Sequence, residues 1–292
     1  MASQEPPRKS GGETRPLLAI DGDSLAHRSF HALPKSIRRR DGGGGGAIVG
    51  FANFLIRLHE SERPRAVVVA WDMPGAPNFR QRLFAPYQGG RDFDPDLIDQ
   101  LAILPDFVTA CGFVSVSAPG YEADDFLAAA ATTEEHGGGT ALVATGDRDA
   151  FQLASARTTV LHPVKAGEIA RIGAAEVHDR YGVAPAQVAD FIALRGDPSD
   201  KIPGARGVGP KRAAALLQQF GSLDAILAAG HFADQADDLR LFRTLATMDS
   251  TARLPVLRDH EPQWGQAAGL AREWGLNQLA RRLADLASQQ AT

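Results

Sequence analysis

Short runs of apolar residues, each followed by an acidic residue, recur along the first half of the chain. Residues 17–20 stop at Asp21, residues 66–71 stop at Asp72, and residues 140–144 lead into Thr145-Gly146-Asp147. Runs that polar residues do not interrupt are typical of strands buried on both faces of a parallel sheet. Between them, residues 47–60, 94–112 and 122–135 have helical patterns, the second with a kink or break expected at Pro105. The alternation predicts an α/β domain with a mostly parallel sheet flanked by helices.

The pattern changes near residue 174, where strand-like runs nearly vanish and short helices follow one another. Residues 185–194, 210–220 and 223–229 each begin near Pro, Gly or Ser and end near Gly. We therefore expect an α/β domain over residues 16–174 and a helical subdomain over residues 175–292. Residues 1–15 are polar and lack the apolar stretch of a secretory signal, which predicts a disordered tail. The five consecutive glycines from Gly42 to Gly46 predict a mobile loop.

The composition narrows the class of protein. Hydrophobic residues make up 44% of the chain and charged residues 23%, as in globular proteins, which excludes global disorder. A single cysteine, Cys111, excludes a disulfide-stapled scaffold and indicates a reducing, cytoplasmic setting. The chain has no stretch of 18 apolar residues, so we expect no membrane span. A formal charge of -4 argues at first against a nucleic-acid partner.

Acidic residues gather where the predicted strands end, the edge at which doubly wound sheets bind ligands. A helix that begins near residue 122 brings further acids to this edge. Taken one by one, each acid is explained by a helix cap, a helix dipole or a turn. Together they would repel one another at neutral pH unless raised pKa values or bound cations relieve the repulsion. Oxygen ligands without His or Cys clusters favour Mg²⁺ or Mn²⁺ over zinc. The acids are Asp21, Asp72, Glu122, Asp124, Asp125, Asp147 and Asp149.

A Gly- and Pro-rich segment, residues 196–211, adds two more acids between predicted helices, Asp197 and Asp200. Its end, Gly207 to Pro210, opens a helix with proline near the first position. Backbone N–H groups at such a start bind phosphate, and two cations follow, Lys211 and Arg212. Alone, the segment is explained by an ordinary tight turn between helices. Next to the acids, it indicates a clamp for a duplex backbone beside a metal site.

Together, these motifs resemble the bacterial 5′-nuclease family, meaning stand-alone flap endonucleases and the N-terminal 5′-nuclease region of DNA polymerase I. The order and spacing agree from residue 16 to about residue 288. The resemblance implies a PIN-like 5′-nuclease core, an arch over the active site, and a helix-three-turn-helix at about residues 185–230. The matching segments are residues 20–32, Trp71-Asp72, residues 78–80, residues 119–125, residues 145–149 with Gln152-Leu153, and residues 196–204.

The family implies a structure-selective 5′-3′ exonuclease or flap endonuclease that hydrolyses DNA phosphodiester bonds in replication and repair. Two or more Mg²⁺ or Mn²⁺ ions would activate water and stabilise the leaving oxygen. The implied metal ligands, which are also catalytic, are the nine acids Asp21, Asp72, Glu122, Asp124, Asp125, Asp147, Asp149, Asp197 and Asp200. Arg91 is implied as a further catalytic residue, and Ser199 as part of a K⁺ site. The implied DNA contacts are Arg28, Arg80, Tyr87, Gln88, Arg91, Gly207, Gly209, Lys211 and Arg212.

One departure from the family pattern affects the expected rate. The family has Tyr-Lys-x-x-Arg in the arch, with the lysine on the scissile phosphate, whereas this chain has Tyr87-Gln88-Gly89-Gly90-Arg91. A neutral Gln88 gives less electrostatic support to the transition state. We therefore expect slower chemistry than in a relative with lysine. The same residue motivates an alternative, a DNA-junction-binding protein with attenuated catalysis.

Two other hypotheses stay open: a phosphatase-like hydrolase with Asp21 as nucleophile, and an RNA-cleaving compact nuclease. The expected partners are DNA with 5′ flaps, nicks, gaps or 5′ ends, and a DNA polymerase only in trans. We expect a monomer in the cytoplasm, at the bacterial nucleoid, with no membrane contact. Removing nine acids from 35 leaves 26 against 31 lysines and arginines. The charge of -4 thus averages an acidic site with a mildly basic surround, and DNA binding should depend on metal as well as salt.

Overall fold

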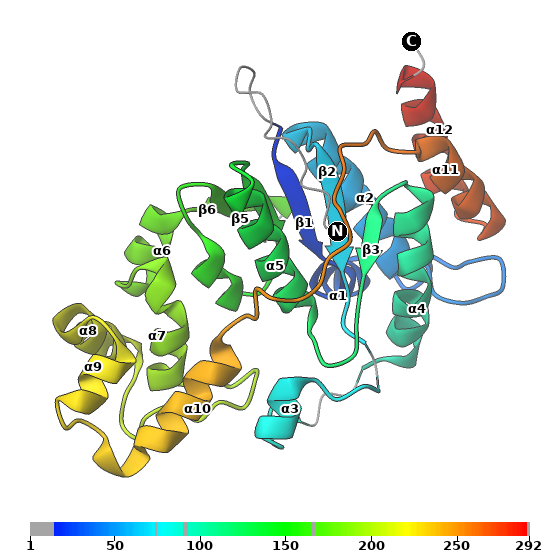
Figure 1. The fold of residues 1–292 in the computed structure, drawn as a ribbon. Coiled ribbons are helices and arrows are strands. Elements are labelled where there is room, and N and C mark those ends of the chain that lie inside the picture. The colour runs from blue at the N-terminus through cyan, green and yellow to red at the C-terminus, as the bar shows by residue number, and fades with distance from the viewer. Residues whose placement is uncertain (1–14, 74, 90–92, 165–166, 291–292) are drawn as a thin grey trace, which may run out of the picture.

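The computed structural model describes residues 15–73, 75–89, 93–164 and 167–290. Its centre is a six-stranded sheet in the order β3-β2-β1-β4-β5-β6 (Figure 1). The paired neighbours from β3 to β5 are parallel, and β6 is antiparallel to β5. This confirms the expected α/β class with a mostly parallel sheet. The strands are β1 (Leu17–Asp21), β2 (Ala66–Ala70), β3 (Val114–Val116), β4 (Ala141–Ala144), β5 (Thr158–Pro163) and β6 (Ile169–Ile172).

The strand order determines where ligands bind. β1 pairs on one side with β2 and on the other with β4, so Leu17 lies beside both Ala66 and Ala141. The chain therefore moves outward from β1 in one direction and later returns to β1 on its other side. Such a switch point, at the carboxyl ends of the strands, is where doubly wound sheets bind ligands.

Helices cover both faces of the sheet. On one face, Leu17 and Ala19 pack in a core with α5 (Ala123–His136). On the other, Leu18 and Ile20 pack in a second core with α2 (Gly46–Glu62) and α4 (Pro95–Ala110), which runs through Pro105 as one helix. Because successive side chains of a strand point to opposite faces, each fully buried strand supplies both cores. Each large apolar side chain buried in this way stabilises the fold by about 1.5–3 kcal/mol.

The helical region after the sheet divides into two parts (Figure 1). Five helices form the helical subdomain, and the last two pack back onto the α/β domain, where Trp264 and Leu283 join the core of α2 and α4. The structure thus differs from the expectation of one helical subdomain over residues 175–292. The subdomain helices are α6 (Ala174–Tyr181), α7 (Val188–Arg195), α8 (Pro210–Phe220), α9 (Leu223–Ala228) and α10 (Ala236–Ala246). The returning pair is α11 (Trp264–Glu273) and α12 (Asn277–Gln290).

The shorter elements connect these layers. Within the described ranges, no helix is long and apolar enough to cross a membrane. The expected disordered tail, residues 1–15, falls almost wholly outside the described residues. The remaining elements are α1 (Gly22–Ala32), α3 (Phe79–Leu83) and the 3-10 helices η1 (Asp149–Leu153), η3 (Pro185–Gln187) and η4 (Ala233–Gln235).

The glycine tract, for which we expected a mobile loop, contains a hydrogen-bonded turn that leads into α2. Arg39 donates its N–H to the Gly43 carbonyl (2.8 Å), and Gly45 donates to the Ile37 carbonyl (3.0 Å). A Cβ at Gly44 would lie 2.5 Å from the Gln100 side-chain nitrogen. Glycine is therefore needed here for close approach rather than for disorder.

Candidate active site

Two strand ends and a helix start bring aspartates together at the carboxyl edge of the sheet. Asp21 ends β1 and caps α1, and its carboxylate accepts hydrogen bonds from the Ser24 N–H (2.9 Å) and the Thr145 hydroxyl (2.6 Å) beyond β4. Asp72 follows β2, and its carboxylate accepts from the Ala123 N–H (2.8 Å) at the start of α5. These bonds fix the ends of β1, β2, β4 and α5 relative to one another.

Five aspartates form what we call the acidic cluster: Asp21, Asp72, Asp124, Asp147 and Asp149. Burial, the largest cause, together with the charges of Asp72 and Asp147, raises the pKa of Asp21 to about 7. Burial and then the charges of Asp21 and Asp147 hold the pKa of Asp124 well above its ordinary value. The pKa of Asp149 is likewise raised, first by burial and then by Asp147. The structure therefore brings these predicted residues into one repulsive group.

The cluster has the donor chemistry of a divalent metal site. One carboxylate oxygen of Asp124 is buried without a hydrogen-bond partner. A buried oxygen of this kind is costly unless something compensates it, and a hard cation does so. In the described part of the chain, no three His, Cys, Asp or Glu side chains already form a group that could hold a metal ion. The residues present fit a divalent metal by donor type and by charge.

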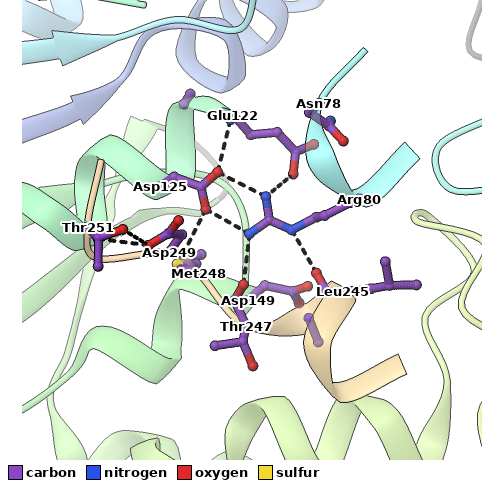
Figure 2. Close-up of polar contacts among 12 residues, drawn as sticks. Asn78, Arg80, Glu122, Asp125, Asp149, Leu245, Thr247, Met248, Asp249 and Thr251 are labelled. Carbon is purple, nitrogen blue, oxygen red and sulfur yellow. Dashed lines mark hydrogen bonds and ion pairs between the residues drawn. The ribbon is translucent and has the colours of Figure 1, made fainter. Parts of the chain in front are cut away.

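A buried arginine holds the two remaining acids of the α5 start (Figure 2). Arg80 is 2% exposed, and its guanidinium donates to Glu122 (2.6 Å) and to both oxygens of Asp125 (2.7 and 3.0 Å). It also donates to the backbone carbonyls of Leu245 and Thr247 (both 2.8 Å) at the end of α10. One side chain therefore connects α3, α5 and the helical subdomain; we call this arrangement the Arg80 hub.

The Arg80 hub bears on the roles expected for Asp125 and Arg80. Asp125 is 0% exposed and also accepts from the N–H groups of Glu122 (3.0 Å) and Asp249 (2.8 Å) (Figure 2). Both oxygens of Asp125 are thus occupied, with four hydrogen bonds from Arg80 and two backbone N–H groups. Arg80 has its guanidinium turned inward among these partners, so it does not reach a DNA phosphate. Glu122 lies between the Arg80 hub and the acidic cluster. Burial, the largest cause, raises its pKa to about 7, and Arg80 acts in the opposite direction.

The segment after α3 also differs from expectation. Tyr87 is 4% exposed, and its hydroxyl lies 3.2 Å from Glu122 and 3.4 Å from Asp200, so it packs under the site instead of facing DNA. Gln88 donates from its side-chain amide to the Asp200 carboxylate (3.2 Å) and from its backbone to the Asp200 carbonyl (3.3 Å). Its amide thus touches an acid of the site. Arg91 lies outside the described residues.

The loop after α7 brings the last two acids beside η1. Asp197 and Asp200 are each 8% exposed, and Asp197 pairs with Arg195 (3.2 Å) and accepts from the Ser199 N–H (2.8 Å). Their charges add to the raised pKa of Asp149, which shows that the loop adjoins the acidic cluster. This hydrogen bond holds Ser199, the residue that we predicted to take part in a K⁺ site, against Asp197.

The predicted phosphate contacts of the helical subdomain lie on the surface. Gly209 is the N-cap of α8, and Lys211 and Arg212 in its first turn are exposed. Gly207 precedes them with a φ of 72°, a backbone conformation that favours glycine. Arg28 is exposed on α1 and donates to the Val164 carbonyl. These residues are accessible to a phosphate backbone.

One acid near the site was not assigned as a candidate ligand. Asp23 accepts from the Asp72 N–H (2.7 Å), and burial and then the charge of Asp72 hold its pKa well above the ordinary value. Its position two residues after a strand-end aspartate was the available signal. The hydroxyl of Thr145, which positions Asp21, left no such signal, because a strand-end threonine is common.

Comparison with known proteins assigns the chain to a family. A family model described as "5'-3' exonuclease, N-terminal resolvase-like domain" matches residues 16–182, and "5'-3' exonuclease, C-terminal SAM fold" matches residues 183–264. DNA polymerase I of Mycobacterium tuberculosis is 42% identical over 214 residues, 72% of this chain and 24% of the relative. The thermostable DNA polymerase I of Thermus aquaticus is 41% identical over 212 residues, 72% of this chain and 25% of the relative. The chain thus spans about a quarter of the length of these curated relatives.

Solved structures share the fold at lower identity. T5 5'-exonuclease with bound zinc ions has a TM-score of 0.68 at 18% identity, with 93% of this chain and 99% of that chain covered. A T5 D15 flap endonuclease complex with DNA and metal ions has a TM-score of 0.67 at 18% identity, covering 94% and 100%. The catalytic core of Rad2 with DNA substrate has a TM-score of 0.61 at 14% identity, covering 93% and 92%.

Proposed function

Since the chain belongs to the 5′-3′ exonuclease family and is a nuclease, we propose that it is a structure-selective 5′ nuclease with divalent metal at the acidic cluster. Its substrates would be DNA with 5′ flaps, nicks, gaps or 5′ ends. The observation that carries the proposal is the acidic cluster itself, in which Asp21 and Asp124 have raised pKa values and no described cation beside them. Repulsion of this kind is relieved by bound cations.

The proposed metal ligands are eight of the nine predicted acids, without Asp125. Their carboxylate oxygens favour Mg²⁺ or Mn²⁺. When bound, two such ions supply an activated water and stabilise the leaving oxygen in phosphodiester hydrolysis. The ligands are Asp21, Asp72, Glu122, Asp124, Asp147, Asp149, Asp197 and Asp200.

The chain's own residues prepare this site. Thr145 and Ser24 orient the Asp21 carboxylate, and the Ala123 N–H orients that of Asp72. Fixed donors of this kind reduce the reorganisation needed when charge develops in the reaction. The Arg80 hub fixes the start of α5, on which Asp124 lies. We propose further that Ser199 takes part in a K⁺ site.

DNA would be held at the start of α8. The N-terminal N–H groups of the helix and the exposed side chains of Lys211 and Arg212 are suited to phosphate. Arg28 offers a further phosphate contact. We propose that the protein acts as a monomer at the bacterial nucleoid.

The second candidate is a DNA-junction binder with attenuated catalysis. Gln88 favours it, because a neutral amide stands where the family's lysine would meet the scissile phosphate, and this amide is bonded to Asp200. A missing cation lowers transition-state stabilisation but leaves the acidic cluster intact.

Cleavage of a 5′-flap substrate labelled at both ends decides between the candidates. We expect cleavage with Mg²⁺ or Mn²⁺, none with EDTA, and at least about a hundredfold loss in Asp124→Asn. Asp285→Asn, which changes an exposed acid on α12, is the matched control and should cleave normally. Flap binding without cleavage by the wild type would favour the binder. Phosphate release from small monoesters would instead support a phosphatase.

A further inference from the structure

A cavity lined by four cations lies between α6, α7, α8 and the start of η1. Its volume is about 470 Å³, within the range of about 300–1,000 Å³ typical of small-molecule sites. Its cationic side chains are Arg148, Arg180, Arg195 and Lys211, and no acidic residue lines it. We call it the basic pocket.

Three of the four cations of the basic pocket have no anionic partner among the described residues. In the described part of the chain, the side chains of Arg148, Arg180 and Lys211 form no ion pair or hydrogen bond. Arg195 pairs with Asp197, yet its Nε is buried without a hydrogen-bond partner. Converging cations without compensation favour an anion, just as the acidic cluster favours a cation.

The walls of the basic pocket are built by fixed contacts. Gln218 of α8 donates to the carbonyl of Gly182, the residue that caps α6 (2.7 Å). Tyr181 stacks on Phe191 of α7 with ring centroids 5.2 Å apart, and the Arg195 guanidinium lies 5.4 Å from the Phe191 ring centroid. Three helices are thus held around the cavity, so the walls that carry its cations are in place before any ligand arrives.

The chemistry of the basic pocket matches a phosphate. Guanidinium groups bind phosphate oxygens in a two-pronged geometry, and three of the four cations are arginines. Lys211 also lies in the first turn of α8, an eleven-residue helix whose N-terminal N–H groups and dipole favour an anion. These features are independent of the acidic cluster.

We propose that the basic pocket binds a backbone phosphate of the DNA, through Arg148, Arg180 and Arg195 as well as Lys211. The proposal rests on the proposed function and adds to it three contacts outside the predicted clamp. Its position supports DNA over a free nucleotide. One wall is the start of α8, and the other adjoins the acidic cluster, because Arg148 lies between Asp147 and Asp149. A DNA strand that touches both the start of α8 and the acidic cluster would cross the basic pocket.

Binding of a nicked duplex with a 5′ flap, measured in EDTA so that no strand is cut, tests the proposal. The variant Arg148→Gln/Arg180→Gln removes two exposed cations. The control Arg258→Gln/Arg281→Gln removes two exposed arginines elsewhere. We expect the pocket variant to bind about tenfold more weakly and to reduce the slope of log K against log salt by about 1–2, between about 50 and 200 mM KCl. The control should change the slope by much less.

Equal slopes in the two double variants would overturn the proposal. Titration with a deoxynucleoside 5′-monophosphate tests the other source of phosphate. Nucleotide binding that only the pocket variant loses, with an unchanged DNA slope, would also overturn it in favour of a nucleotide site. Arg148→Lys/Arg180→Lys keeps the charge and should fall between wild type and the glutamine variant. Because binding is measured without cleavage, absence of nuclease activity would refute the proposed function and leave this test intact.

Discussion

Replacing Arg80 by methionine should destabilise the whole fold rather than weaken DNA binding directly. The change keeps an unbranched side chain of similar length and removes the guanidinium from the Arg80 hub. Five hydrogen bonds are lost, three of them to carboxylates at 2.6–3.0 Å. Asp125, which is 0% exposed, is left as a buried acid without its counter-ion.

The expected magnitude follows from that unpaired acid. Removing one partner of a buried ion pair costs about 3–5 kcal/mol in unfolding free energy. A typical domain has about 5–15 kcal/mol in total, so the loss is a large fraction of the stability. Arg80→Lys keeps the charge but loses the two-pronged contact with Asp125, and should cost less. In Arg80→Met/Asp125→Asn, the acid that lost its partner is neutralised, so part of the stability should return.

Urea unfolding followed by circular dichroism measures these differences, since a shifted midpoint at constant slope reports stability. Arg281→Met, at an exposed arginine of α12, should stay within about 0.5 kcal/mol of the wild type. The reasoning is refuted if Arg80→Met unfolds like the wild type but binds flap DNA more weakly. That result would restore the role in DNA binding first expected for Arg80.

Two further predictions concern pH and rate. Burial lowers the pKa of His59 from 6.5 to about 4, so the unfolded chain binds a proton that the folded chain does not. The contribution of His59 to stability should therefore fall as pH drops from about 6.5 towards 4. His59→Phe, which keeps the ring contacts with Phe113 and Trp264, should flatten the dependence of the melting temperature on pH over this range. An unchanged pH dependence would contradict the role given to His59. Gln88→Lys should raise the single-turnover rate of flap cleavage by supplying the missing cation, and no gain in rate would sink this idea.

Local patterns predicted those parts of the fold that are buried on both faces. β2 and β4 are apolar throughout and β1 is apolar as far as Asp21, and the helical spacings of α2, α5 and α8 are regular. Each was therefore expected close to its observed position. β5 and β6 were missed because their sequences mix polar and apolar residues, although most of β5 is buried. The return of α11 and α12 to the α/β domain was missed because an amphipathic pattern gives a buried face but not the surface that it packs against.

The candidate site could likewise be predicted only where a local pattern placed its residues. Strand-end position identified Asp21 and Asp72, because the carboxyl ends of parallel strands meet at one edge. It did not separate Asp124 from Asp125, which are neighbours in sequence. Their difference arises from Arg80 and from two carbonyls near residue 246, more than 100 residues away in the chain. Only tertiary packing decides which of two adjacent acids receives a cation from the protein.

That difference suggests how the protein assigns its acids. Asp125 and Glu122 are paired with Arg80, and Asp197 with Arg195, whereas Asp21 and Asp124 have no cation beside them among the described residues. The ion pairs tie these acids into the fold, although burial still raises the pKa of Glu122 to about 7. The others keep raised pKa values and remain electrostatically unsatisfied until a cation binds. Pairing every acid internally would stabilise the metal-free fold but would also compete with the metal for the same oxygens. The incomplete pairing is therefore what a metal-dependent site requires, and the opposite imbalance in the basic pocket suits a polyanion on the adjacent surface.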